Sequence, residues 1–267
     1  MDHFAALGEC LAHTTPFETL TKFSLIMVEL HFHITESSLP LIPLFRFLPS
    51  TLQHLNILNL SSTLDFSSLF NSLSESACYP KLTFLELEFI FNPSFRYSCQ
   101  SIHRFLLTHN NNLQLLDLNV GPRDEEHLGA WLTNLAGTEF QFSSLQTLGM
   151  SFSTPQTGLS AVLPLIKRTA PTLSALSINF HALDFEEAEQ VVDALTEGGG
   201  QFSMATRTIE EVPGKLKSLT IEINQLSVPF LDLLARNLPQ LEELYLWTPE
   251  IVGSDQVLSC LISTYLN

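Results

Sequence analysis

A six-residue pattern repeats through most of the sequence and constrains the fold more than any other feature. It consists of a leucine, two variable residues, an apolar residue, one variable residue and another apolar residue, as in LTFLEL at residues 82–87. Successive copies open 32, 30, 31, 32, 28, 43 and 25 residues apart. A nearly constant period in this range is typical of a solenoid of stacked units. The eight copies open at Leu20, Leu52, Leu82, Leu113, Leu145, Leu173, Leu216 and Leu241.

Each copy of the pattern predicts a β-strand, because apolar and other residues alternate along it. Leu85, Leu87 and Phe89 follow this period of two, which places their side chains on one face of an extended chain. Prolines stand two residues before three of the copies, where they stop an incoming helix and lead into extended chain. These prolines are Pro80, Pro171 and Pro239.

The segments between the copies predict helices. Asp184 is expected to cap one whose inner face holds Phe185, Ala188, Val191, Val192 and Leu195. Asp124 is expected to cap another with Leu128, Trp131, Leu132 and Leu135 inside. Further helices are expected over residues 2–13, 66–76, 100–108, 158–168, 229–237 and 254–265. The fold prediction is an α/β repeat domain of about eight units over residues 1–267, with a glycine-rich, flexible insertion near 197–215.

The repeated pattern and its period resemble the leucine-rich repeats, in units like those of the ribonuclease-inhibitor-like subtype. Stretches such as LPSTLQHL at residues 48–55 and PQLEEL at residues 239–244 are similar to those of fungal F-box/leucine-rich-repeat proteins. The resemblance implies a horseshoe with a parallel concave sheet and convex helices. It also implies recognition of a target protein in a ubiquitin-ligase assembly, with the ligase adaptor as a second partner. At the position where the usual repeat carries Asn or Cys only Asn224 fits, and residues 1–16 contain no F-box-like motif.

Composition narrows the classes of partner. The chain has 12 basic and 28 acidic residues and a net charge of −16, which disfavours binding to nucleic acid or to an anionic membrane. A protein partner with a basic surface is compatible with this charge. The four cysteines are far apart and form no CxxC pair, which argues against a disulfide framework and a zinc site. With no visible signal peptide, we expect a cytoplasmic or nuclear protein.

The variable residues of each copy predict the surface that a partner would contact. Residues two, four and six positions after the opening leucine point away from the core, onto the concave face. Carboxylates and aromatic rings gather there in two places, where charge would steer a basic partner and aromatic area would hold it. The predicted partner-binding residues are Phe84, Glu86, Glu88, Leu115, Asp117, Glu222, Glu243, Tyr245 and Trp247.

No catalytic, cofactor or metal motif is legible in the sequence. His31 and His33 share a face of one extended segment, but no third ligand stands near them, so a structural role is expected. No nucleophile elbow, phosphate-binding loop or dinucleotide fingerprint occurs. We therefore expect a non-enzymatic interaction scaffold that needs no cofactor. Two alternatives stay open: a regulatory repeat module unrelated to ubiquitin, for instance one that regulates a GTPase, and an enzyme with dispersed catalytic residues.

Overall fold

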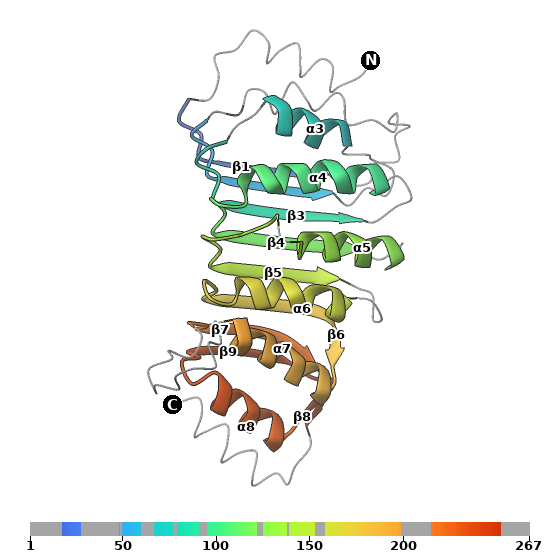
Figure 1. Ribbon diagram of the computed structural model, residues 1–267, viewed down its shortest axis with the longest axis vertical. Coiled ribbons are helices and arrows are strands. Elements are labelled where there is room, and N and C mark those ends of the chain that lie inside the picture. Colours follow the sequence, from blue (N-terminus) through green and yellow to red (C-terminus); the bar gives the residue numbers. More distant parts are fainter. Residues whose placement is uncertain are drawn as a thin grey trace.

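The computed structural model describes residues 18–27, 48, 50–59, 67–76, 79–90, 95–121, 125–137, 139–152, 158–198 and 215–251. Within these ranges strands and helices alternate, and eight strands form one all-parallel sheet in the order β1-β2-β3-β4-β5-β6-β7-β9 (Figure 1). The helices cover one face of the sheet. We call the other one the open face, since no described helix lies on it. The predicted α/β class is confirmed.

The elements have the following bounds. The strands of the large sheet are β1 (Lys22–Met27), β2 (His54–Asn59), β3 (Phe84–Ile90), β4 (Leu115–Gly121), β5 (Thr147–Phe152), β6 (Ala175–Leu183), β7 (Ser218–Ile223) and β9 (Glu243–Trp247). The helices are α3 (Ser67–Ser76), α4 (Phe95–His109), α5 (Glu125–Leu135), α6 (Gly158–Thr169), α7 (Phe185–Gly198) and α8 (Val228–Asn237). The short strands β8 (Gln225–Leu226) and β10 (Glu250–Ile251) pair in a second sheet.

The strands and five of the helices expected between them are confirmed, while the helix expected at 100–108 begins earlier, at Phe95. Asp124, the helices expected at 2–13 and 254–265, and most of the insertion at 197–215 lie outside the described residues. The prolines act as expected: α6 ends two residues before Pro171, and α8 ends two residues before Pro239.

The leucines of the repeated pattern build the core. Their side chains form columns that run across the sheet from strand to strand, and in the middle repeats these residues are almost completely buried. At the outer strands the equivalent Leu25, Leu244 and Leu246 are only partly buried. Phenylalanines fill the space behind the sheet: Phe152 and Phe180, for example, stack with ring centroids 4.8 Å apart. The repeat therefore stabilises itself by stacking each unit on the next.

A backbone ladder joins successive repeats at the start of every strand. In each repeat one carbonyl, that of the residue after the opening leucine, accepts two N–H bonds from the next repeat. The Gln53 carbonyl, for example, accepts from Thr83 and Phe84, each at 2.9 Å. The same pairing recurs at all seven junctions of the large sheet. This ladder holds the described turns together without the asparagine column that the usual leucine-rich repeat carries.

The prediction that Asp184 caps α7 is confirmed, whereas the prediction that Phe185 lies on the buried face of α7 is wrong. The Asp184 carboxylate accepts the backbone N–H of Glu187 at 2.8 Å, and the Glu187 carboxylate accepts that of Asp184 at 3.0 Å, which is a capping box. Ala188, Val191, Val192 and Leu195 are buried as expected, whereas Phe185 is 45% exposed. Phe185 is the first helical residue, and Leu183, buried at the end of β6, fills the core at this point.

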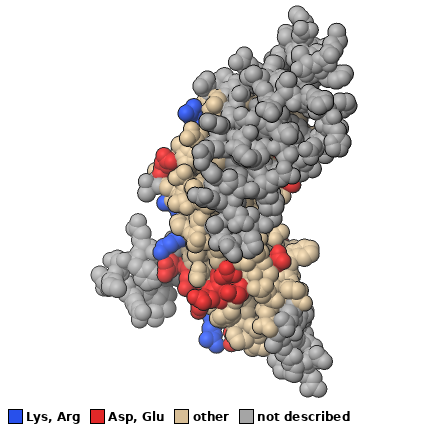
Figure 2. Space-filling view, turned by 90° about the vertical axis from the view of Figure 1, so that its right-hand side faces the viewer, with Lys and Arg blue, Asp and Glu red and all other residues tan. Residues whose placement is uncertain are grey.

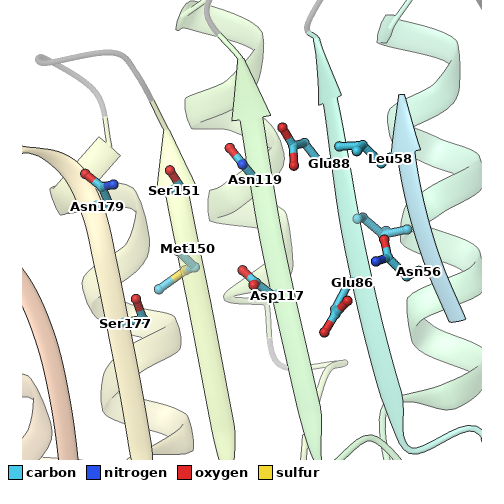
Figure 3. A pocket seen from close by; sticks show the side chains of 11 residues that line it. Asn56, Leu58, Glu86, Glu88, Asp117, Asn119, Met150, Ser151, Ser177 and Asn179 are labelled. Carbon is cyan, nitrogen blue, oxygen red and sulfur yellow. The ribbon is translucent and has the colours of Figure 1, made fainter. Parts of the chain in front are cut away.

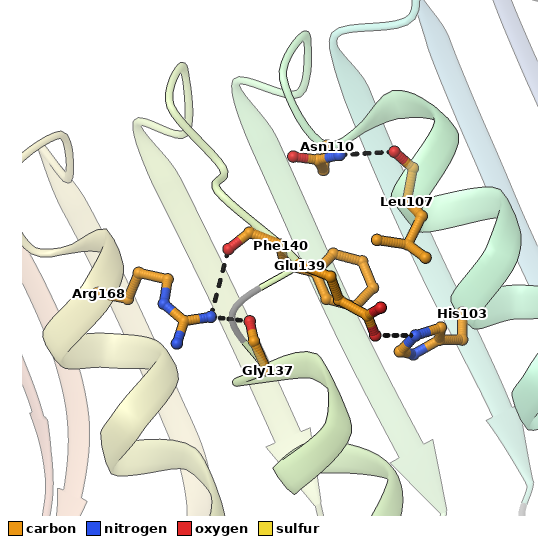
Figure 4. A network of polar contacts seen from close by, with 7 residues as sticks. All are labelled: His103, Leu107, Asn110, Gly137, Glu139, Phe140 and Arg168. Atoms are coloured by element: carbon orange, nitrogen blue, oxygen red, sulfur yellow. Dashed lines mark hydrogen bonds and ion pairs between the residues drawn. The ribbon is translucent and has the colours of Figure 1, made fainter.

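Residues 136, 137 and 139–146, which connect α5 to β5, are contacted by side chains from α6 and from the end of α4 (Figure 4). Arg168 of α6 donates to the carbonyls of Gly137 and Phe140. From α4, His103 pairs with Glu139 at 2.7 Å. Asn110, also from the end of α4, accepts the backbone N–H of Gln141 at 3.2 Å. These contacts link residues about one repeat apart, so the side chains that bind this loop supply part of the cohesion between repeats.

Candidate functional site

The open face carries three rows of side chains that run across the sheet. The strand register aligns the residues predicted to point away from the core, so the predicted rows are confirmed in their placement. The first row is Lys22, His54, Phe84, Leu115, Thr147, Ala175, Ser218 and Glu243. The second is Ser24, Asn56, Glu86, Asp117, Gly149, Ser177, Thr220 and Tyr245. The third is Ile26, Leu58, Glu88, Asn119, Ser151, Asn179, Glu222 and Trp247, and it is interrupted between Asn179 and Glu222, because the register between β6 and β7 shifts after Ile178.

Two neighbouring strands, β3 and β4, bring the first predicted group together. We call it the central acidic patch; it consists of Phe84, Glu86, Glu88, Leu115 and Asp117. Glu86 lies directly opposite Asp117, and Phe84 lies opposite Leu115. Three carboxylates and two apolar side chains thus share one part of the open face.

His54 joins this patch from β2, which the sequence reasoning did not foresee. Its Nε2 lies 3.3 Å from a carboxylate oxygen of Glu86, and its ring stacks on that of Phe84 with centroids 5.8 Å apart. The signal was present in the repeat, because His54 occupies the same outward position as Phe84. His54 holds the ring of Phe84 and one carboxylate in place.

Asp117 sits in the middle of the face, over a glycine. A Cβ atom built on Gly149 would come within 2.5 Å of an Asp117 carboxylate oxygen, so only glycine leaves room for this position of the carboxylate. Partial burial of the carboxyl raises the pKa of Asp117 above its ordinary value, and the negative charges of Glu86 and Glu88 raise it further. Residue 117 as a whole remains open to solvent. A positive charge placed here would therefore relieve the repulsion among three carboxylates.

An open pocket of about 260 Å³ lies over this region (Figure 3). Figure 3 shows the carboxylates of Glu86, Glu88 and Asp117 on two adjacent strands, and the rest of the pocket is lined by amide and hydroxyl groups together with Leu58, Leu87 and Met150. These amide and hydroxyl side chains are Asn56, Asn119, Ser151, Ser177 and Asn179. The pocket thus combines charged acceptors on its two middle strands with neutral hydrogen-bonding groups on the strands that flank them, which suits polar or cationic side chains.

The second predicted group lies at the edge of the sheet, and we call it the edge patch: Glu222, Glu243, Tyr245 and Trp247. The last three stand on β9, and Trp247 lies opposite Glu222 of β7. Tyr245 is 55% exposed and Trp247 is 70% exposed. Large aromatic side chains that stay this exposed are typical of interaction surfaces.

Positive charge is scarce among the residues of the three rows. Lys22 is the one lysine or arginine among the 24 residues of the three rows, against five carboxylates. Figure 2 shows a different side of the molecule, the one toward which the strands of Figure 1 point; acidic side chains gather in its lower half, with Lys and Arg side chains nearby. The charged side chains that a basic partner meets in the three rows are therefore predominantly negative.

The remaining histidines form no site in the described residues. His103 and His181 pair with Glu139 and Glu187, whereas His109 is buried with its Nε2 unpaired, between the rings of Tyr79 and Phe105. His31 and His33 lie outside the described residues. No group of three or more His, Cys, Asp or Glu side chains in the described ranges is arranged to hold a metal ion.

None of the helices in the described part of the chain combines the length and apolar character needed to span a bilayer.

Comparison with known sequences gave no match. No protein-family model matches the chain, and no curated protein shows significant sequence similarity to it.

Proposed function

We propose that the chain is a protein-interaction module of the leucine-rich-repeat type that binds a basic protein segment on the open face of its sheet. The single observation that carries the proposal is the composition of the three rows. Five carboxylates and the exposed rings of Phe84, Tyr245 and Trp247 share a face with one lysine. Charge accelerates the encounter with a basic partner, and burial of aromatic area slows its dissociation.

The state of Asp117 supports a cationic partner. Burial and the charges of Glu86 and Glu88 raise its pKa in the free protein. A bound Lys or Arg side chain favours the ionised carboxylate, so binding should strengthen as the pH rises through that raised pKa. Because part of the attraction comes from exposed charges, it should also weaken as salt is added.

The finer assignment is that this module recognises targets for a ubiquitin ligase of the F-box type. Its support is the resemblance of the repeats at residues 48–55 and 239–244 to those of fungal F-box/leucine-rich-repeat proteins. Co-purification of the full chain with a Skp-type adaptor tests this assignment. Binding of basic targets without the adaptor would favour a regulatory module unrelated to ubiquitin.

A pull-down with immobilised lysine- and arginine-rich peptides tests the binding proposal. The parent chain should be retained, and the variant Glu243→Lys with Trp247→Ala should be retained much less, because it reverses one charge and removes one ring of the edge patch. Glu189→Lys is the matched control, since it makes the same charge change at an exposed position of α7 on the helix side. Equal retention of all three proteins would refute binding through the edge patch.

A further inference from the structure

Between the central acidic patch and the edge patch, the residues of the open face have short side chains. Strands β5, β6 and β7 present no aromatic or long apolar residue in the three rows. We call this part of the face the low stretch; it consists of Thr147, Gly149, Ser151, Ala175, Ser177, Asn179, Ser218 and Thr220. Larger and charged side chains stand on both sides of it, on β3 and β4 and on β9.

The width of the low stretch matches one structural element. Strand β9 is four strand spacings from β4, which is roughly 19 Å at about 4.8 Å per spacing. An α-helix with its side chains is about 10–12 Å across. A helix lying along the strands therefore has room between the patches and lies within reach of both.

Backbone hydrogen bonding also favours a helix over an extended segment. An extended peptide gains affinity mainly by pairing its backbone with a free sheet edge. Outside the irregularity between Ile178 and Leu183, the backbone groups of β5, β6 and β7 pair with neighbouring strands on both sides. A helix satisfies its own backbone groups and needs only side-chain contacts from this surface.

We infer that the partner segment is an α-helix with small residues along the stripe that faces the low stretch and with Lys or Arg along both flanks. This inference rests on the proposed function, because it specifies the conformation and pattern of the basic segment. Cations on one flank meet Glu86 and Asp117, and cations on the other meet Glu222 and Glu243. The short side chains in between permit close approach of the helix.

The probe is a fluorescent synthetic peptide of about 18 residues, which forms roughly 27 Å of helix. It carries Ala and Ser along one stripe, Lys on both flanks, and a side-chain staple on its outer face. The comparison peptide has the same composition and two D-residues that prevent helix formation. Anisotropy titration should show the stapled peptide binding at least about tenfold more tightly than the comparison peptide, because the latter must leave backbone groups unpaired.

Two variants locate the helix. Glu86→Gln with Glu243→Gln removes one charge on each side and should weaken binding of the stapled peptide about tenfold. Thr220→Trp places a large ring in the low stretch and should abolish binding, whereas Gln190→Trp, at an exposed position of α7, should have no effect. Circular dichroism of each variant confirms that it is folded.

The outcomes separate this inference from the proposed function. Equal or weaker binding of the stapled peptide, while the basic baits of the pull-down are still retained, overturns the helix and leaves the interaction module in place. Unchanged binding after Thr220→Trp overturns the location. Failure of both peptides and of the pull-down overturns both proposals.

Discussion

Acid should destabilise this protein through one buried histidine. His109, at the end of α4, is 1% exposed and lies between Tyr79 and Phe105, with ring centroids 6.2 Å and 4.7 Å away. Its Nε2 has no hydrogen-bond partner. Burial lowers the pKa of His109 from the usual 6.5 to about 4, because the charged ring would lose its hydration.

The sign and size of the effect follow from linkage. Between pH 6.5 and 4 the unfolded chain binds a proton at this histidine and the folded chain does not, so the free energy of unfolding falls as the pH falls. The contribution of His109 is fully present above pH 6.5. At pH 5 the loss amounts to about 2 kcal/mol, on the basis of about 1.4 kcal/mol per pKa unit.

Urea unfolding followed by circular dichroism at pH 7.5 and pH 5 measures this loss. In His109→Gln the difference between the two pH values should shrink by about 2 kcal/mol, because the titrating group is gone. His103→Gln is the control, since His103 is partly exposed and paired with Glu139. An identical pH dependence in the parent and in His109→Gln would show that His109 does not cause the loss of stability in acid.

Three further predictions concern the core packing, the loop between α5 and β5, and the cap of α7, and urea unfolding tests each of them. Leu118→Ala, in the centre of the core, should cost about 3 kcal/mol, and Leu246→Ala, partly buried on β9, clearly less; equal costs would contradict the stacked core. Arg168→Ala removes a charged donor from two loop carbonyls and should cost about 2 kcal/mol, whereas Lys167→Ala, which breaks an exposed ion pair, should cost under about 1 kcal/mol. Glu187→Ala should cost about 1 kcal/mol by opening the capping box, and an unchanged stability would show that the box contributes nothing.

The parts of the fold that depend on local periodicity were predictable from the sequence. Alternation within each copy of the pattern assigned inward and outward residues, and the constant period aligned them, so the pairing of Glu86 with Asp117 and of Glu222 with Trp247 could be foreseen. The role of Asp184 as a helix cap was also predictable, because a cap depends only on residues about three positions away in the sequence.

Contacts between repeats were not predictable from such patterns. Arg168 reaches Gly137, and Asn110 reaches Gln141, across about 31 residues, and nothing in the local sequence marks either pair. The close approach of the Asp117 carboxylate to Gly149 becomes evident only in the structure, since no local pattern in the sequence links the two residues. Helical spacing alone predicted that Phe185 is buried. That spacing takes no account of Leu183, which is buried at the end of β6, just before the helix.

On the proposed function, the open face of the sheet, and not the face covered by the helices, binds the basic partner. The most direct test is photocrosslinking with a photoreactive amino acid at position 177 on the open face or at position 190 on the helix face. Each protein is irradiated with a lysine- and arginine-rich peptide that the pull-down retains, and the adducts are quantified by mass spectrometry. Adducts from position 177 and none from position 190 are predicted. Adducts from position 190, with none from position 177, would contradict the claim.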